Sequence, residues 1–139
     1  MFTEKFDSYV CIGDTITCDV DGFTLVAQIE HDTYTRIDDD DCHNVDQEVT
    51  GCNAAQQKKL IEAREQYRRK YRDWFYCGVV ISVSRNGVDI SEHAASLWGI
   101  ECNYPGSNNA YLSEVASELI DDALSCARDS LNAMRAALA

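Results

Sequence analysis

The stretch GDTITCDVDGFTLVAQIEHDTYT, residues 13–35, predicts a β-hairpin and with it the fold class. Ile16, Cys18 and Val20 alternate with polar residues, as expected of a strand that buries one face. Asp21–Gly22 suits a type I′ turn, because both central residues of that turn need positive φ. The returning residues place four apolar side chains on one face: Phe23, Leu25, Ala27 and Ile29. We therefore expect an antiparallel sheet that begins with this hairpin.

A second hairpin is predicted in FYCGVVISVSRNGVDIS, residues 75–91. Its first half alternates apolar and other residues, and Asn86–Gly87 is a strong turn signal. After an irregular passage, EHAA, the segment SLWGIECN (96–103) is expected to form one more strand. YPGSNN (104–109) then predicts a turn or loop. Two hairpins and this extra strand make a sheet of four to five strands.

Two segments predict helices. NAAQQKKLIEAREQYRRKYRDW (53–74) begins with Asn53, a capping residue, and Gln56 stands near the position that a capping box needs. Its apolar residues recur at helical spacing and predict a buried stripe made of Leu60, Ala63, Tyr67, Tyr71 and Trp74. Residues 109–139 predict one amphipathic helix, about 40 Å long if unbroken, without an internal glycine or proline.

The predicted fold is therefore a single α+β domain over residues 1–139 with the order ββαβββα. Its two helices are expected to cover one face of the antiparallel sheet. The chain is 45% hydrophobic, which favours folding over disorder. Its first residues lack the apolar run of a signal peptide, and no segment reaches the roughly 18 apolar residues of a membrane span. We expect a cytoplasmic protein that binds no membrane.

Cysteine is frequent for this length, with seven residues in an odd count and no C-x-x-C pair. Most of them are expected to be reduced and to act as small hydrophobic side chains, since no secretory signal is present. A disulfide framework is accordingly not expected. The cysteines are Cys11, Cys18, Cys42, Cys52, Cys77, Cys102 and Cys126.

The net charge of −12 is unevenly distributed along the chain. Residues 1–50 carry −11, residues 51–85 carry +5 and residues 86–139 carry −6. A protein this acidic repels nucleic acid at long range and is attracted to basic surfaces. A competing interpretation of these acids is that they only keep the protein soluble.

The most acidic stretch is RIDDDDCHNVDQE, residues 36–48, and it predicts a loop because adjacent aspartates repel one another. Cys42, His43 and Cys52 are candidate zinc ligands, and the aspartates 38–41 are candidate ligands of calcium or magnesium. Zinc sites usually pair ligands at tight spacing, and calcium loops alternate ligands with spacers around a glycine. This stretch does neither, so we expect no cofactor, and the metal question at these three residues stays open.

No catalytic motif is recognisable, whether nucleophile elbow, phosphate-binding loop or H-E-x-x-H. A non-enzymatic protein is therefore expected, and a metal- or cysteine-dependent enzyme is an alternative. A further alternative is a nucleic-acid-binding accessory protein that uses the basic helix 58–72. That helix could equally be a solvated face, or could neutralise the acidic residues that precede it. The net charge disfavours direct nucleic-acid binding.

Three phrases resemble short uncharacterised proteins carried by bacteriophages and prophages of proteobacteria. They are GDTITCDVDGFTLVAQIEHDTYT (13–35), GVVISVSRNGVDI (78–90) and HAASLWGIECNYPGSNNAYLSEVASELIDDAL (93–124). The resemblance covers most of the chain and is strongest in LWGIECNYPG (97–106) with the following helix, whereas the basic helix after Gly51 departs from it. That family has no assigned chemistry, so no functional residue carries over. The resemblance implies a phage setting, and anti-CRISPR proteins and DNA mimics enter by analogy only.

We therefore expect a phage-encoded, non-enzymatic binding protein that inhibits a bacterial defence complex in an anti-CRISPR-like way, through an acidic surface able to mimic DNA. Its partner would be a host protein or nucleoprotein complex with a basic surface. The carboxylates expected to bind are Asp38, Asp39, Asp40, Asp41, Asp46 and Glu48. A second candidate surface, made of Arg64, Arg68 and Arg72, suits an acidic partner, nucleic acid or a second copy in a homodimer.

Overall fold

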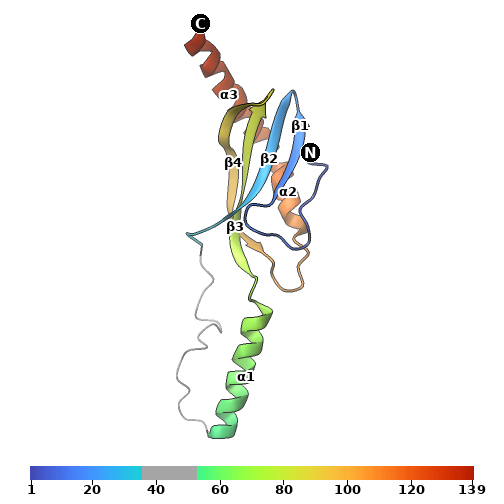
Figure 1. Ribbon diagram of the computed structural model, residues 1–139, viewed down its shortest axis with the longest axis vertical. Helices are drawn as coiled ribbons and strands as arrows, with labels where there is room; N and C mark the ends of the chain where they lie inside the picture. The colour runs from blue at the N-terminus through green and yellow to red at the C-terminus, as the bar shows by residue number, and fades with distance from the viewer. Residues whose placement is uncertain (36–52) are drawn as a thin grey trace.

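The structure is a computed structural model that describes residues 1–35 and 53–139. It confirms an α+β fold built on a four-stranded antiparallel sheet with strand order β1-β2-β3-β4 (Figure 1). The strands are β1 (Thr15–Val20), β2 (Phe23–His31), β3 (Phe75–Arg85) and β4 (Val88–Cys102). The helices in the described ranges are α1 (Ala54–Lys70), α2 (Ala110–Glu118) and α3 (Ile120–Leu138).

Both predicted hairpins are confirmed, with the turns at the predicted pairs. Asp21 and Gly22 have φ of 53° and 82°, and Asn86 and Gly87 have φ of 52° and 78°. Positive φ at both central residues is the requirement of a type I′ turn, which asparagine, aspartate and glycine meet at low cost. The two hairpins then join through β2 and β3, where Ile29 lies opposite Val79.

The core lies between one face of the sheet and the helices α2 and α3. α3 packs on β3 and β4, and α2 packs on β3. The alternate residues of the two central strands that face this layer are almost fully buried: Leu25, Ala27, Ile29, Val79, Ile81 and Val83. The helices contribute Leu112, Ala116, Ile120, Ala123, Leu124 and Ala127. Among the described residues, the helices that pack on the sheet are α2 and α3, and both lie on this one face. We call the opposite face the open face.

β4 differs from the expected pattern of two shorter strands. It is continuous over Val88–Cys102, which makes the order ββαββα when the terminal helical region counts once. The passage expected to be irregular is a bulge, because Ile81 pairs with Ala95 while Val83 pairs with Ser91. The extra residues leave the ladder locally, and pairing then resumes in the same strand. The predicted fifth strand is therefore wrong.

The terminal helix is interrupted at Leu119, between α2 and α3, although no glycine or proline stands there. Leu119 has φ of −83° and ψ of −7°, and its N–H donates to the carbonyls of Val115 and Ala116. Beyond Leu131 every residue is exposed, including Leu138 at 87%. The end of α3 thus extends past the sheet (Figure 1), and the predicted apolar stripe is buried only in its first half.

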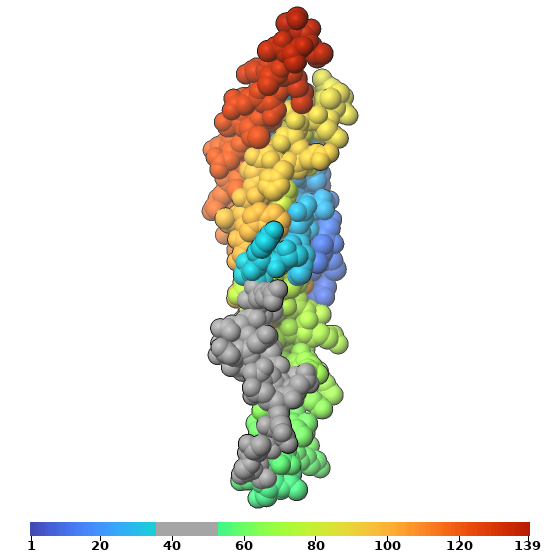
Figure 2. Space-filling model, turned by 90° about the vertical axis from the view of Figure 1, so that its left-hand side faces the viewer, coloured from blue at the N-terminus to red at the C-terminus, as the bar shows by residue number. Residues whose placement is uncertain are grey.

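α1 projects from the opposite end of an elongated molecule (Figures 1 and 2). The predicted capping box is confirmed, since Gln56 N–H donates to the Asn53 side chain and Asn53 N–H donates to Gln56. The predicted buried stripe is wrong for α1 itself, which contains no buried residue and leaves Leu60 37% exposed. Its last two members, Tyr71 and Trp74, follow α1 and are partly buried against Tyr104. Helical spacing places apolar residues on one side of a helix, but it does not supply an element that covers them.

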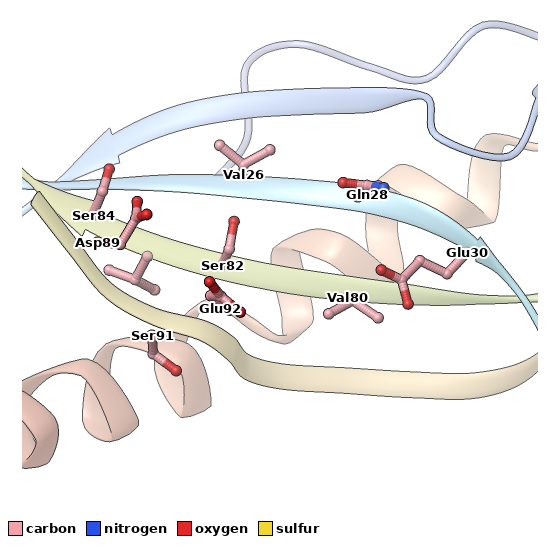
Figure 3. A pocket seen from close by; sticks show the side chains of 10 residues that line it. Val26, Gln28, Glu30, Val80, Ser82, Ser84, Asp89, Ser91 and Glu92 are labelled. Atoms are coloured by element: carbon pink, nitrogen blue, oxygen red, sulfur yellow. The ribbon is translucent and has the colours of Figure 1, made fainter. Parts of the chain in front are cut away.

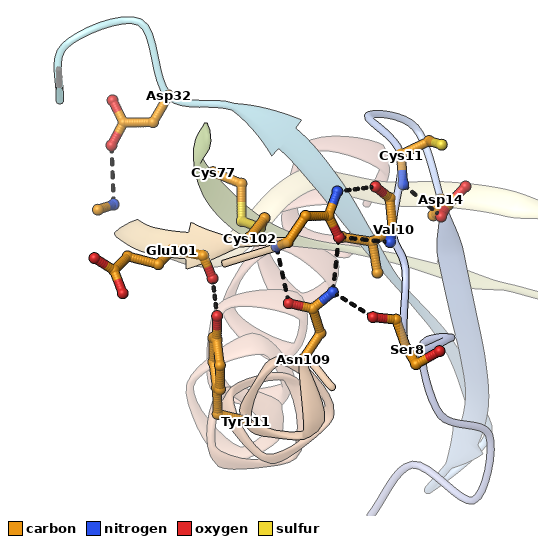
Figure 4. Close-up of a disulfide and its surroundings, with 12 residues drawn as sticks. Ser8, Val10, Cys11, Asp14, Asp32, Cys77, Glu101, Cys102, Asn109 and Tyr111 are labelled. Carbon is orange, nitrogen blue, oxygen red and sulfur yellow. Dashed lines mark hydrogen bonds between the residues drawn. A yellow bond between two sulfur atoms is a disulfide. The ribbon is translucent and has the colours of Figure 1, made fainter. Parts of the chain in front are cut away.

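Cys77 and Cys102 form a disulfide between β3 and β4, with Cα atoms 6.4 Å apart (Figure 4). Both cysteines are fully buried. The expectation that the cysteines stay reduced is therefore wrong for this pair. Among the other cysteines in the described ranges, Cys11, Cys18 and Cys126 are free thiols.

Residues 1–10 run along α2 and close the side of the core (Figure 1). Phe2 N–H donates to Ser117 Oγ at 3.3 Å, and Phe6 N–H donates to Ser113 Oγ at 3.0 Å. Val10 N–H donates to Asn103 Oδ1 at 3.0 Å, and Asn103 Nδ2 returns a bond to the Val10 carbonyl at 2.8 Å. Since Phe2 and Val10 are buried, this arm is part of the folded domain.

Candidate functional site

The predicted site residues divide into two groups. Asp38, Asp39, Asp40, Asp41, Asp46 and Glu48 lie outside the described residues, as do Cys42, His43 and Cys52. Arg64 and Arg68 lie on α1, and Arg72 follows it with its Nε 3.7 Å from Asp73 Oδ1. The acidic and basic candidate surfaces both remain predictions. Among the described residues, the open face of the sheet forms a further candidate site.

The open face follows from strand geometry. Successive side chains of a strand point to opposite faces, so the residues between the buried positions of β2 and β3 point away from α2 and α3. Figure 3 shows these side chains in front of the sheet with the helices behind it. They line a shallow pocket of about 310 Å³ together with residues of β4. The lining is Val26, Gln28, Glu30, Val80, Ser82, Val83, Ser84, Asp89, Ser91 and Glu92.

This pocket is anionic with an apolar floor. Glu30, Asp89 and Glu92 supply three carboxylates, and the lining contains no lysine or arginine. Val80 lies on this face at only 5% exposure, and Val26 adds a second apolar side chain. Val83, whose side chain belongs to the core, borders the pocket, and the other lining residues are serines and one glutamine. A basic protein surface could approach such a face closely, because small side chains leave the backbone accessible and the carboxylates attract cations.

Trp98 lies on the same face, at one end of the pocket. A Cβ built on Gly78 would lie 2.6 Å from Cδ2 and 2.7 Å from Cζ3 of the indole, so the ring covers Gly78 closely. The indole Nε1–H donates to Ser96 Oγ at 3.1 Å, and His93 Nε2 lies 2.8 Å from the same oxygen. Trp98 is nevertheless 41% exposed. The ring is held in one orientation and still presents aromatic surface to solvent.

Asp32, whose side chain is drawn in Figure 4, fixes the backbone next to Trp98. Its Oδ2 accepts a hydrogen bond from Gly99 N–H at 2.9 Å, while Oδ1 accepts from the N–H groups of Tyr34 and Thr35 at 2.9 and 3.0 Å. The hydrogen bonds from Thr35, first of all, and those from Tyr34 and Gly99 lower the pKa of Asp32 below its ordinary value. Asp32 is 4% exposed, so the site contains a buried carboxylate that stays ionised.

Gly99 has φ of +74°, a conformation that favours glycine, and it sits where the β3–β4 register shifts. Cys77 pairs with Ile100 and Val79 pairs with Leu97, so two residues of β4 stand opposite Gly78. This bulge brings Trp98 over Gly78, and Asp32 holds the bulge through Gly99. β2, β3 and β4 thus all contribute to placing one aromatic ring.

Sequence reasoning missed this face. The signal was present, because Gln28, Glu30, Ser82 and Ser84 occupy the polar positions of the predicted strands. Polar positions in a strand normally mean only solvent exposure. The placement of Trp98 over Gly78 and the contact of Asp32 with Gly99 depend on strand pairing and on a bulge, which no local pattern reports.

The described ranges hold no cluster of three or more histidine, cysteine, aspartate or glutamate side chains placed to bind a metal ion. Within the same ranges, no helix has the length and apolar character needed to span a bilayer. No protein-family model matches the chain, and comparison with curated proteins and with solved structures found no similar protein. Functional inference therefore rests on the residues themselves.

Proposed function

We propose that this chain is a non-enzymatic binding protein whose open sheet face docks on a basic surface of a partner protein. The observation that carries the proposal is the composition of that face. Three carboxylates surround an apolar floor, no lysine or arginine lines the pocket, and an oriented tryptophan stands at its end. Charge complementarity steers association, and a rigid, partly exposed aromatic residue is typical of the residues that dominate binding energy.

For the partner class, the proposal adds the phage setting that the sequence resemblance implies. Proteins of phages and prophages meet host defence complexes, whose nucleic-acid channels are lined by lysine and arginine. An anionic face of this kind would suit such a channel, and the protein would act as an anti-CRISPR-like inhibitor that occupies a site for nucleic-acid phosphates. In this proposal, the carboxylates Asp38–Asp41, Asp46 and Glu48 would add to the attraction.

Two charge-reversal variants test the face. Asp89→Lys/Glu92→Lys changes two lining residues, and Asp122→Lys/Asp129→Lys makes the same change in net charge on the exposed side of α3. Tagged proteins are used to capture partners from a proteobacterial host lysate at low and at high salt. The first variant should lose capture by about tenfold or more, and the second should retain it.

Capture by the wild type should also weaken as salt screens the charges. Equal losses in the two variants would show that only bulk charge matters, which contradicts a specific face. Full retention in both variants would show that this face is not used. Capture that resists high salt would contradict a charge-steered interface.

α1 offers a second candidate function, because it contains no buried residue and carries several exposed basic side chains. Lys58, Lys59, Arg69 and Lys70 are exposed and would suit nucleic acid or an acidic partner. Lys58→Glu/Lys59→Glu with Arg69→Glu/Lys70→Glu tests it in a labelled-oligonucleotide assay. Oligonucleotide binding that this variant abolishes would favour the nucleic-acid function over docking by the sheet face.

A further inference from the structure

A second pocket adjoins the open face at the end of β2. It has a volume of about 520 Å³ and is lined by residues 31–35 and Trp98. We propose that this pocket accepts an arginine side chain of the partner, which would stack on the indole of Trp98. This inference rests on the proposed function, because it names the group by which the partner would be anchored.

The first argument is the accessible aromatic surface. The Gly78 backbone lies against one face of the six-membered ring of the indole, since a Cβ there would overlap three adjacent ring atoms. The exposed part of Trp98 therefore belongs to its other face and edge, and Tyr34 stands at the same pocket with 97% exposure. Cations are attracted to the faces of tryptophan and tyrosine rings, tryptophan most strongly.

The second argument is fixed negative charge. Asp32 lines the pocket, and its two oxygens accept from three neutral backbone N–H groups. Among residues 1–35 and 53–139, no lysine or arginine forms an ion pair with Asp32. Its charge is therefore stabilised by dipoles and not cancelled by a cation there. A buried charge of this kind is screened less than one in water, so it favours an incoming cation.

The third argument is the neighbouring carboxylate. Glu30 pairs with Gly78 across β2 and β3, so Glu30 and Trp98 flank the same glycine. Glu30 also lines the pocket of the open face, which places it between the two pockets. An arginine on Trp98 would thus lie near Asp32 and Glu30. Arginine is favoured over lysine because its planar guanidinium stacks on aromatic rings and is weakly hydrated.

The test uses N-acetyl-arginine amide as the probe and N-acetyl-citrulline amide as its neutral counterpart of nearly equal shape. Both are titrated into the ¹⁵N-labelled protein, and amide and indole resonances are followed by NMR. The arginine probe should shift residues 31–35, Gly99 and the Trp98 indole in a saturable way, and the citrulline probe should not. Trp98→Leu should weaken arginine binding about fivefold or more, and Leu97→Ala, a change at another exposed apolar residue of β4, should not.

Equal shifts with citrulline would show that charge is not recognised, and shifts that persist in Trp98→Leu would place the probe elsewhere. Either result, or no shift at all, would overturn the arginine pocket. Dispersed amide spectra of both variants verify that they fold. The proposed function is judged separately, because loss of lysate capture in Asp89→Lys/Glu92→Lys would uphold the sheet face even when the pocket fails. Retained capture in that variant would reject the face itself.

Discussion

The indole ring of Trp98 occupies the space that a side chain at position 78 would need. A glycine in the middle of a strand usually weakens a sheet, because glycine loses more backbone entropy on folding than other residues and has no side chain to pack. Here the aromatic ring fills that gap and shields the strand, which is a recognised way to compensate a strand glycine. Gly78 and Trp98 therefore form one structural unit on the open face.

Gly78→Ala should displace the indole and destabilise the protein by about 1–3 kcal/mol, the range of overpacked sites. The free energy of unfolding is measured by urea titration for Gly78→Ala, Trp98→Ala and the double variant. If the cost arises from the clash, the double variant is more stable than the sum of the single effects predicts. Strict additivity would contradict the contact between the two residues.

Asp32→Asn should lower the midpoint of urea unfolding near neutral pH, because an amide cannot accept all three backbone N–H bonds. The pKa of Asp32 is lowered in the folded state, so its ionised form contributes stability above the unfolded value of about 3.9. That contribution is lost as pH falls through the lower folded pKa. The difference in urea midpoint between the wild type and Asp32→Asn should therefore become smaller at acid pH.

Unfolding midpoints measured from neutral to acid pH check this prediction. Asp129→Asn, at an exposed position of α3, is the matched control and should leave the midpoint nearly unchanged at neutral pH. If the difference in midpoint between the wild type and Asp32→Asn stays constant down to the lowest pH, the charge of Asp32 does not stabilise residues 32–35 and Gly99.

Asn109→Ala should destabilise the protein by about 2–4 kcal/mol. The fully buried Asn109 side chain donates to the Ser8 carbonyl and to Asn103 Oδ1 and accepts from Asn103 N–H (Figure 4). Alanine leaves these groups without that partner and keeps a Cβ at a residue with φ of +59°. Asn109→Gly loses the same bonds without this backbone strain, so it should be about 1 kcal/mol less harmful. Thermal or urea unfolding distinguishes the two contributions, and equal losses would rule out strain.

Thiol labelling of the native protein should separate the cysteines by burial. Cys11 is exposed and should react first, whereas burial, chiefly, raises the pKa of the Cys18 thiol and should slow its reaction. Peptides with Cys77 or Cys102 should stay unlabelled until the protein is reduced and unfolded. Peptide mass mapping reads each site. Rapid labelling of Cys77 or Cys102 without reductant would contradict the disulfide.

Removal of the disulfide gives an independent measurement. Cys77→Ala/Cys102→Ala should lower the free energy of unfolding by about 3 kcal/mol, the range for closing a loop of this length. The two cysteines are 25 residues apart in the chain. Cys18→Ala is a useful comparison, because that residue is only partly buried and unpaired. An equal effect of the two changes would show that cross-linking contributes nothing.

The local parts of the fold were predictable from sequence, because their causes are local. Asn86–Gly87 and Asp21–Gly22 accept positive φ wherever they occur, and the helix cap at Asn53 involves residues three apart. Non-local features could not be predicted in the same way. The bulge in β4 and the disulfide between Cys77 and Cys102 exist only because β3 and β4 pair in one register.

The candidate site also has features that a local sequence pattern predicts and features that depend on strand pairing. Runs of like charge are visible in a sequence, and they predicted binding surfaces at residues 36–48 and on the basic helix. The open face is a property of the sheet, and its polar positions are ordinary when each strand is considered alone. Asp32 contacts Gly99 across 67 residues, so its role in placing Trp98 has no local signal.

The arm formed by residues 1–10 has a consequence for how the protein is made. Phe2 and Val10 find side-chain partners 115 and 93 residues further along the chain. On a ribosome these first residues emerge long before Asn103 and Ser117 have been translated, and folding during synthesis proceeds from the beginning of a chain. The arm therefore stays in solvent, with Phe2 uncovered, until Asn103 and Ser117 have left the ribosomal exit tunnel. Chaperone contact in that interval would fall on residues 1–10.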